Sequence, residues 1–525
     1  MSRRVVAAPR LPFAMLRALL LGPSLALLAG RPAGAQSAPR ATAALAPVPD
    51  AQGMQREYRA RREALAARMG DGILVALGAS EPVRDYESFS QTPDFFYLTG
   101  WREPDAALVM VRRGDSLATT LFVSPRDPAR EVWSGVRAGP EAAAQLTGMA
   151  ARPRAALDAM LDSLAGAGLP VHALGVLSGR AGGPRTADDQ FFDALRATHP
   201  GLRVNTEVGR QIAELRGRKS AAELALIRRA VELTVLAHRE ALGALEPGMN
   251  EFELQALIEY TFRRNGADRP SFATIVGSGP NATTLHYNAD DRFIQAGDLV
   301  VMDIGASYRG YAADVTRTLP ATGRFTAEQR AIYQLVRDAQ AAAERQAKPG
   351  APAQRMNDSA TAVLAAGLAR LGLIESASAT YDCAPARDGG AARQCPQLTL
   401  FYMHGLGHGI GLDVHDPDQY YFTGTVAPGS VFTLEPGVYV RANLLDILPD
   451  TPRNRALAQR IGAAVRRYAN IGVRIEDDYV VTETGADWIS RAPREIDEIE
   501  RAMAAPYAGP ARRAPAIVES YRGTP

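Results

Sequence analysis

The chain has 525 residues, of which 46% are hydrophobic and 22% are charged, and its formal net charge is +2. This composition is ordinary for a globular protein and excludes a fibrous or low-complexity chain, and without a basic patch nucleic acid is not an expected partner. The length exceeds that of one ordinary domain, so we expect at least two.

The first predicted element is a signal peptide at residues 1–35. Several arginines are followed by an uncharged run at 18–30 and by Ala33-Gly-Ala35, the small-x-small pattern of a cleavage site. The run is short for a membrane-spanning helix, so we expect no stable membrane anchor after cleavage, with an unprocessed N-terminal anchor as the alternative. The predicted location of the mature protein is the bacterial periplasm or the exterior.

An α/β domain is predicted from residue 56 to residue 212. Strand-like runs at 72–77, 106–111 and 120–123 alternate there with Ala-rich helical stretches. Residues 36–55, which precede this domain, are rich in Ala and Pro and are predicted to form a linker.

A second domain is predicted from 213 to 503, because the sequence pattern changes near its start. Ser220 and Glu223 have the Ser-x-x-Glu spacing of a helix capping box, which predicts a helix from there to about residue 245. Further helices are predicted at about 251–265, 327–347 and 357–371.

The end of the chain and its cysteines give two smaller predictions. Residues 504–525, rich in Pro, Ala and Arg, are predicted to be an extended tail. Cys383 and Cys395 are the only cysteines. A disulfide between them would close a short loop and stabilise the fold by about 3 kcal/mol in the chain-entropy model, whereas two free thiols are the alternative.

Two aspartates lie in the β-rich arms of one segment, on either side of the turn Ser307-Tyr-Arg-Gly310. We predict that the hairpin folds about Tyr308–Arg309, which pairs Asp303 with Asp314. Directly opposed side chains lie roughly 5 Å apart, where like charges repel. Such a pair needs a shared proton or a cation between its members.

Imidazoles are concentrated in two Gly-rich segments. His404, His408 and His415 lie within 401–416, where alternating glycines disfavour a helix, so this is not the helical zinc motif His-Glu-x-x-His. His286 lies in the second segment. Oxygen-rich sites with one imidazole suit hard or borderline divalent ions.

Two further acidic residues, Glu435 and Glu476, each lie in a strand-like apolar run. A carboxylate in such a run is costly to bury without a partner.

From about residue 218 to residue 500 the sequence resembles the pita-bread metallopeptidases, in particular the branch of aminopeptidase P and prolidase. The matching blocks are Ile275-Val-Gly-Ser-Gly-Pro-Asn281 with Leu285-His-Tyr287, the Asp303/Asp314 hairpin, His404-Gly-Leu-Gly-His408 with Leu412-Asp-Val-His-Asp416, Glu435-Pro-Gly-Val-Tyr439, and Arg474-Ile-Glu-Asp-Asp478. Residues 91–101 and 121–133 resemble the N-terminal domain of the same branch. The implied fold is an α/β N-terminal domain plus an α+β pita-bread catalytic domain.

The resemblance implies two divalent metal ions per subunit, with Mn²⁺ the common choice in the family. Their implied ligands are Asp303, Asp314, His408, Glu435 and Glu476. In this scheme a metal-bridging hydroxide attacks the scissile carbonyl, since metal binding lowers the pKa of water towards neutrality. The implied catalytic residues are Glu435 as proton acceptor and His286, His404 and His415, which line the substrate side together with Tyr439 and Arg474.

The predicted activity is that of an Xaa-Pro aminopeptidase, which removes the residue ahead of Pro from peptides with Pro at the second position. An Xaa-Pro bond has no amide hydrogen and a restricted preceding residue, so it needs a dedicated site. A prolidase, which cuts only Xaa-Pro dipeptides, is the main alternative. The other alternative is a metal-free protein, either a creatinase-like hydrolase or a peptidase-like binding module. A homo-oligomer is expected.

Residues 376–397 and 441–470 depart from the family pattern. Both flank the predicted site in sequence and, as insertions, are expected at the surface, as lids or subunit contacts. They leave the preference for substrate length open.

Overall fold

The computed structural model describes residues 47–84, 87–177, 185–384 and 392–510. The predicted signal peptide, most of the predicted linker and the end of the predicted tail lie outside these residues. Within them, no helix is both long enough and apolar enough to cross a membrane. Helix α1 (Ala51–Met69) begins inside the range predicted as a linker, because Asp50 caps it by accepting a hydrogen bond from the backbone of Gly53 at 2.6 Å.

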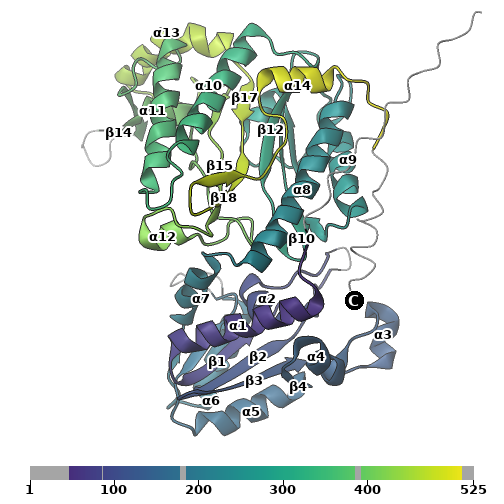
Figure 1. Cartoon of the computed structure of the whole chain (residues 1–525). Helices are drawn as coiled ribbons and strands as arrows, with labels where there is room; N and C mark the ends of the chain where they lie inside the picture. Colours follow the sequence, from purple (N-terminus) through teal and green to yellow (C-terminus); the bar gives the residue numbers. More distant parts are fainter. Residues whose placement is uncertain (1–46, 85–86, 178–184, 385–391, 511–525) are drawn as a thin grey trace, which may run out of the picture. The chain divides into compact units, whose positions relative to one another are not determined.

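The described part of the N-terminal domain contains a six-stranded mixed sheet in the order β4-β3-β2-β1-β5-β6. Alternate side chains of β1, such as Leu74 and Val75, pack into two different core clusters. Both faces of this strand are therefore buried, which explains its continuous apolar run. Figure 1 shows α1 on one face of the sheet and α5 on the other. The strands are β1 (Gly72–Leu77), β2 (Ala107–Arg113), β3 (Ser116–Val123), β4 (Ala150–Pro153), β5 (Val171–Leu174) and β6 (Val204–Asn205).

The helices of this domain include α7 (Val208–Arg216), which spans the predicted domain boundary at 212/213. The others are α2 (Pro93–Thr99), α3 (Pro128–Ser134), α4 (Gly139–Thr147), the 3-10 helix η1 (Arg154–Ala156), α5 (Leu157–Ala165) and α6 (Ala187–Thr198).

The second domain begins with α8 (Ala221–Ala244), and the predicted capping box is confirmed. Ser220 Oγ accepts from the backbone N–H of Glu223 at 3.3 Å, and the Glu223 carboxylate accepts from the backbone N–H of Ser220 at 3.0 Å. Helices α8 and α9 lie on one side of the central strands and α10 and α11 on the other (Figure 1). The remaining helices are α9 (Glu251–Arg264), η2 (Gly279–Thr283), α10 (Ala327–Glu344), α11 (Gln354–Arg370), η3 (Gln397–Leu400), α12 (Gln419–Thr423), α13 (Pro452–Arg467) and α14 (Ile496–Met503).

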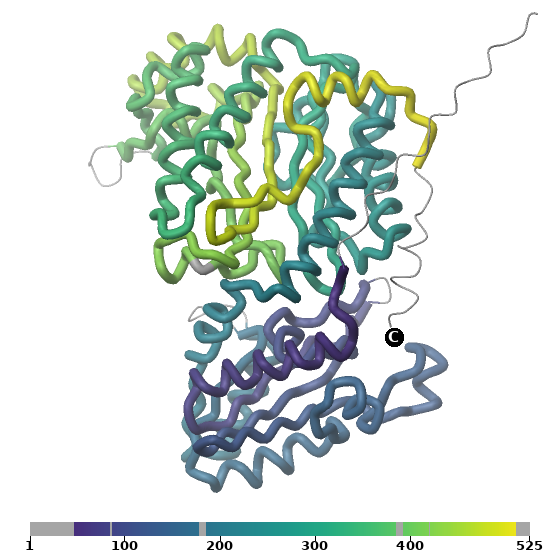
Figure 2. Tube along the Cα trace, in the orientation of Figure 1, coloured from purple at the N-terminus to yellow at the C-terminus, as the bar shows by residue number. Residues whose placement is uncertain are grey.

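Short antiparallel sheets fill the space between these helices. In the described residues they have the orders β12-β9-β8, β15-β18-β19, β16-β17 and β11-β10-β7. The yellow stretch that leads into α14 runs between α10 and α8 (Figure 2). The strands are β7 (Arg269–Pro270), β8 (Ile275–Ser278), β9 (Leu299–Ile304), β10 (Ala306–Tyr308), β11 (Tyr311–Ala312), β12 (Val315–Pro320), β15 (Val431–Leu434), β16 (Gly437–Val440), β17 (Ile471–Arg474), β18 (Asp477–Val481) and β19 (Ala486–Trp488).

The predicted aspartate hairpin exists, but its predicted register is wrong. The turn is centred on Arg309 and Gly310, so Asp303 pairs with Thr316 and not with Asp314. Both central residues have positive φ, 49° for Arg309 and 87° for Gly310, as the two-residue turn of a tight hairpin requires. Thr316 and Asp314 are two positions apart, so Asp314 still shares a face with Asp303, as its diagonal neighbour.

The two segments that depart from the family pattern pack against each other. The described residues of 376–397 include two antiparallel strands, β13 (Thr380–Ala384) and β14 (Arg393–Pro396), which the Cys383–Cys395 disulfide links. The backbone N–H of Asp382 donates to Asn454 Oδ1 at 3.0 Å, and Asn454 Nδ2 donates to the backbone oxygen of Asp382 at 2.9 Å. Since Asn454 lies in α13, both segments form one unit.

Candidate metal centre and active site

A cavity of about 500 Å³ lies within the catalytic domain, and nine of the ten predicted site residues line it. The tenth, Tyr439, is fully buried behind the wall. No residue of 376–397 or 441–470 is among the described residues that line the cavity. The lining residues are Phe272, Ala273, Ile275, Leu285, His286, Asn288, Asp303, Asp314, His404, Gly405, Gly407, His408, Val414, His415, Glu435, Arg474 and Glu476.

Three of the four predicted carboxylate ligands lie close to the imidazole of His408. Its Nε2 lies 3.5 Å from Asp314 Oδ2, 3.6 Å from Glu435 Oε1 and 3.9 Å from Glu476 Oε1. Ligand atoms of Asp314, His408 and Glu476 lie within 4.8 Å of one another, which places them within reach of one ion.

The carboxylates of this cluster fit a divalent cation. Buried oxygens Asp303 Oδ1, Asp314 Oδ1 and Glu476 Oε1 accept no hydrogen bond from any described residue. A buried carboxylate oxygen without a partner is costly, and a metal ion removes that cost. Four carboxylates and one imidazole form a donor set that suits hard or borderline divalent ions.

Electrostatics of the cluster agree with this fit. Burial raises the pKa of Glu435 to about 8. Burial, followed by repulsion from neighbouring carboxylates, raises the pKa of Asp314 and of Glu476 well above the ordinary range. Burial also opposes ionisation of Asp303, but the charge of Arg474 and hydrogen bonds lower its pKa below the ordinary value. Burial lowers the pKa of His408 to about 4, which keeps the imidazole neutral and free to bind a metal.

The glycines around His408 allow close packing against β15. A Cβ atom on Gly407 would lie 2.0 Å from the backbone oxygen of Thr433, and one on Gly409 would lie 2.2 Å from that of Asp416. The backbone N–H of Thr433 donates to the backbone oxygen of His408 at 2.9 Å. The segment is not helical, as predicted, and its glycines let the backbone beside His408 pack closely against neighbouring backbone.

Tyr439, Arg474 and His404 form one polar chain that ends at Asp303. Arg474 Nη2 donates to Asp303 Oδ2 at 2.7 Å, and Arg474 Nη1 donates to the Tyr439 hydroxyl at 2.9 Å. His404 Nε2 lies 2.8 Å from that hydroxyl, and burial lowers the pKa of His404 to about 4, so the neutral imidazole accepts from it. Tyr439 thus orients two wall residues from behind.

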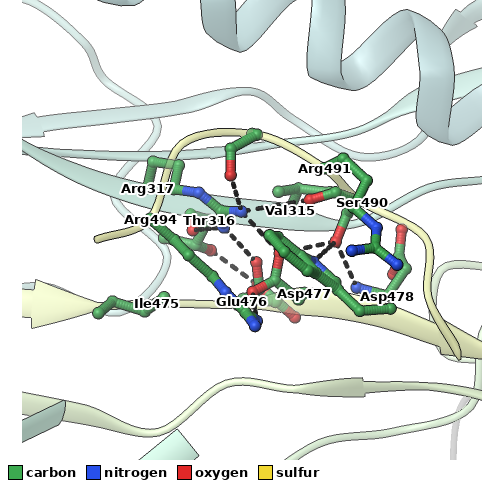
Figure 3. Close-up of polar contacts among 12 residues, drawn as sticks. Val315, Thr316, Arg317, Ile475, Glu476, Asp477, Asp478, Ser490, Arg491 and Arg494 are labelled. Carbon is green, nitrogen blue, oxygen red and sulfur yellow. Dashed lines mark hydrogen bonds and ion pairs between the residues drawn. The ribbon is translucent and has the colours of Figure 1, made fainter. Parts of the chain in front are cut away.

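The backbone around Glu476 is fixed by a buried network (Figure 3). The hydroxyl of Thr316 donates to Glu476 Oε2 at 2.7 Å. Arg317, which is 1% exposed, donates to the backbone oxygen of Glu476 at 2.8 Å and to Asp477 Oδ1 at 2.6 Å. Arg494 donates to the other oxygen of Asp477 at 2.9 Å. These contacts hold Glu476 in place from both sides.

His286 and His415 are the two exposed histidines of the wall. The ring of His415 lies 4.0 Å from that of His408, measured between centroids. The next residue, Asp416, accepts hydrogen bonds from Arg216 at 2.7 Å and from Lys219 at 3.3 Å. Sequence reasoning missed these two cations, because they lie about 200 positions from Asp416 and no local pattern indicates the contact.

Comparisons with known proteins agree with this geometry. Residues 225–483 match metallopeptidase family M24, and residues 58–170 match the aminopeptidase P N-terminal domain. The chain is 34% identical to the Xaa-Pro aminopeptidase of Escherichia coli (strain K12) over 467 residues, which cover 86% of this chain and 98% of that one. It is 35% identical to the human Xaa-Pro dipeptidase over 333 residues, which cover 58% of this chain and 65% of that one.

Solved structures show the same architecture. The low-pH form of aminopeptidase P from E. coli superposes with a TM-score of 0.71 at 31% identity, covering 86% of this chain and 99% of that one. Pseudomonas aeruginosa aminopeptidase PepP gives a TM-score of 0.71 at 33% identity, covering 86% and 98%. The predicted fold class and enzyme class, a metallo-aminopeptidase, are confirmed. The chain therefore belongs to metallopeptidase family M24 and carries the N-terminal domain of aminopeptidase P.

Proposed function

We propose that the protein is an Xaa-Pro aminopeptidase with two divalent metal ions, held by Asp303, Asp314, His408, Glu435 and Glu476. The observation that carries the proposal is the convergence of these five side chains on one cavity. The similarity to an Xaa-Pro aminopeptidase over nearly its whole length supports it. A metal-free relative would have no use for three buried carboxylate oxygens without partners.

The residues around the cavity divide the chemical work. When bound, two divalent ions would lower the pKa of a water molecule and polarise the scissile carbonyl. Glu435, whose Oε2 lies 3.5 Å from His404 Nδ1, accepts the proton of the attacking water. His286 and His415, on the exposed side of the wall, donate to the carbonyl oxygen and to the leaving nitrogen. We infer Mn²⁺ because carboxylate-rich sites suit it, and elemental analysis of the purified protein tests this.

Charge in the cavity favours an aminopeptidase over a dipeptidase. Arg474 is the only arginine or lysine among the described residues that line the cavity. Its guanidinium is already bound to Asp303 and to Tyr439. Among the described lining residues, no unpaired arginine or lysine is thus available to bind the carboxylate of an Xaa-Pro dipeptide. The similarity to the human Xaa-Pro dipeptidase keeps dipeptidase activity as the second candidate.

A substrate series tests the proposal. We expect kcat/KM with Mn²⁺ to be high for an Xaa-Pro-Yaa tripeptide and for a matched pentapeptide, and low for the Xaa-Pro dipeptide. A preference for the dipeptide would show that the protein is a dipeptidase. It would not contradict the proposed metal site. If protein that contains two ions per subunit cleaves none of the three peptides, both candidate activities are wrong.

We also propose that the protein is exported and assembles as a homo-oligomer. The support for export is the signal-like sequence at 1–35. N-terminal sequencing of protein recovered from the periplasm should begin at Gln36, and light scattering gives the mass of the assembly. Full-length protein confined to the cytoplasm would contradict export.

A further inference from the structure

His286 is carried by a loop, and nothing within the described residues fixes its imidazole directly. The side chain lines the cavity but is exposed, and no hydrogen bond to its ring occurs among the described residues. Its position therefore depends on the loop that runs from Ser278 to Arg292. What holds this loop also determines whether His286 faces the reacting atoms.

One buried carboxylate contacts this loop at both of its ends and in its interior. Glu251, at the start of α9, has no exposed surface. Its Oε1 accepts from the backbone N–H of Ser278 at 2.6 Å, where the loop begins. Its Oε2 accepts from the backbone N–H of Arg292 at 2.9 Å, where the loop ends. It also lies 3.1 Å from the Tyr287 hydroxyl, next to His286, and this hydroxyl shares its one proton between Glu251 and Asp291 Oδ1, which lies 2.9 Å away. Glu251 therefore contacts both ends of the loop and the neighbour of the histidine.

The charge of Glu251 is balanced without a cation. Among the described residues, no arginine, lysine or histidine forms an ion pair with it, and the guanidinium of the nearby Arg292 binds Asp298. Asn281 Nδ2 adds a further neutral donor at 3.2 Å. The N-terminus of α9 also favours a negative charge at this position. The N–H and O–H donors of loop 278–292 thus stabilise this carboxylate. The carboxylate, in turn, holds the loop in its conformation.

We propose that Glu251 is a positioning residue for His286: it sets the conformation of loop 278–292 and thereby directs the imidazole into the cavity. This rests on the proposed function, in which His286 contacts the reacting peptide. Glu251 itself lies behind the loop and does not line the cavity.

A double-mutant cycle tests the proposal. Glu251→Gln keeps the size of the side chain but replaces one acceptor oxygen by an NH₂ group, which faces N–H donors. We expect kcat/KM for an Xaa-Pro-Yaa peptide to fall about tenfold or more, since a small misplacement of a catalytic group has effects of that order. In a His286→Ala background the same substitution should change kcat/KM by less than about twofold, because the group it positions is gone.

Further variants separate positioning from a general loss of structure. Tyr287→Phe removes one of the loop contacts and should give a smaller fall that also vanishes in the His286→Ala background. Glu253→Gln, two residues along the same helix, is the matched control: Glu253 only accepts from the backbone N–H of Asn250 at 2.8 Å, and activity should be unchanged. Metal content should stay at the wild-type value in all variants.

A readout independent of activity completes the test. We expect Glu251→Gln to speed amide hydrogen exchange in 278–292 without speeding it in 401–416. Equal falls in kcat/KM with and without His286, full activity of Glu251→Gln, or unchanged exchange in the loop would each overturn the proposal. If wild-type protein does not cleave Xaa-Pro peptides, the proposed function fails, while the exchange experiment still decides whether Glu251 orders the loop.

Discussion

Two histidines whose rings lie side by side have different environments, and this separates their functions. His408 Nε2 lies within 4 Å of three carboxylates, whereas no carboxylate of the described residues forms an ion pair with the exposed His415. We expect His408→Ala to lose metal and turnover together. His415→Ala should keep both ions and lose about 100-fold in kcat, as for removal of one transition-state contact. Metal content measured beside kcat decides this, and loss of one ion from His415→Ala would make His415 a ligand.

A buried aspartate in the His286 loop makes stability depend on pH. Burial raises the pKa of Asp290 from 3.8 to about 7, and nearby carboxylates add to the effect. A group with a raised pKa in the folded state contributes stability that is complete below its ordinary pKa and is lost as the pH rises through the folded value. The contribution of Asp290 should therefore disappear between about pH 4 and pH 7.

Asp290→Asn should remove this dependence and raise Tm at pH 8. Asparagine suits the left-handed backbone at this position, where φ is 46°, and its side-chain oxygen can still accept from the backbone N–H of Val276. The exposed neighbour Asp291 supplies the control, Asp291→Asn, which should leave the pH profile of Tm as in the wild type. An unchanged profile in Asp290→Asn would show that the carboxyl is not the titrating group.

At the scale of single elements, features that depend on neighbouring residues could be predicted from the sequence better than contacts between distant residues. The start of α8 was predictable because Ser220 and Glu223 satisfy each other's backbone within one turn. The hairpin was predicted with a register error of one turn position, since nothing in the sequence states that Arg309 adopts a positive φ. The motif blocks named five candidate ligands, and all five line one cavity, whereas the contact of Arg216 with Asp416 forms only in the folded chain.

The buried network beside Glu476 should contribute to both stability and metal binding. Arg317 and Asp477 are almost completely buried, and breaking such a pair by removing one charge typically costs about 3–5 kcal/mol. We expect Asp477→Asn to lower the free energy of unfolding by this order and to weaken metal binding about 10- to 100-fold. Urea unfolding and metal titration measure the two effects.

A surface ion pair provides the comparison for this variant. Asp487 pairs with Arg228 at 2.9 Å, and both side chains are more than a third exposed. Exposed pairs contribute about 0–1 kcal/mol, so Asp487→Asn should change little. Wild-type metal affinity in Asp477→Asn would mean that Thr316 alone is sufficient to orient Glu476.

At the scale of the whole molecule, the disulfide-closed unit lies apart from the chemistry. It joins β13, β14 and α13, and none of its described residues lines the cavity. We expect Cys383→Ser with Cys395→Ser to lower the free energy of unfolding by about 3 kcal/mol, from loss of a short cross-linked loop. The value of kcat/KM should not change at temperatures where the protein is folded. A fall in kcat/KM in folded protein would connect this unit to the site.

The turn at Arg309–Gly310 limits how the length of this chain can vary. Side chains alternate between the faces of a strand, so adding or removing one residue in this turn would send Asp314 to the opposite side of the hairpin from Asp303. The connection at 441–470 is not constrained in this way, because it returns to β17 through a helix and loops. A change of its length by one residue does not move a side chain to the other face of a strand. Insertions and deletions should therefore accumulate in relatives at the second place, and the four residues from Tyr308 to Tyr311 should keep their number even where their identities differ.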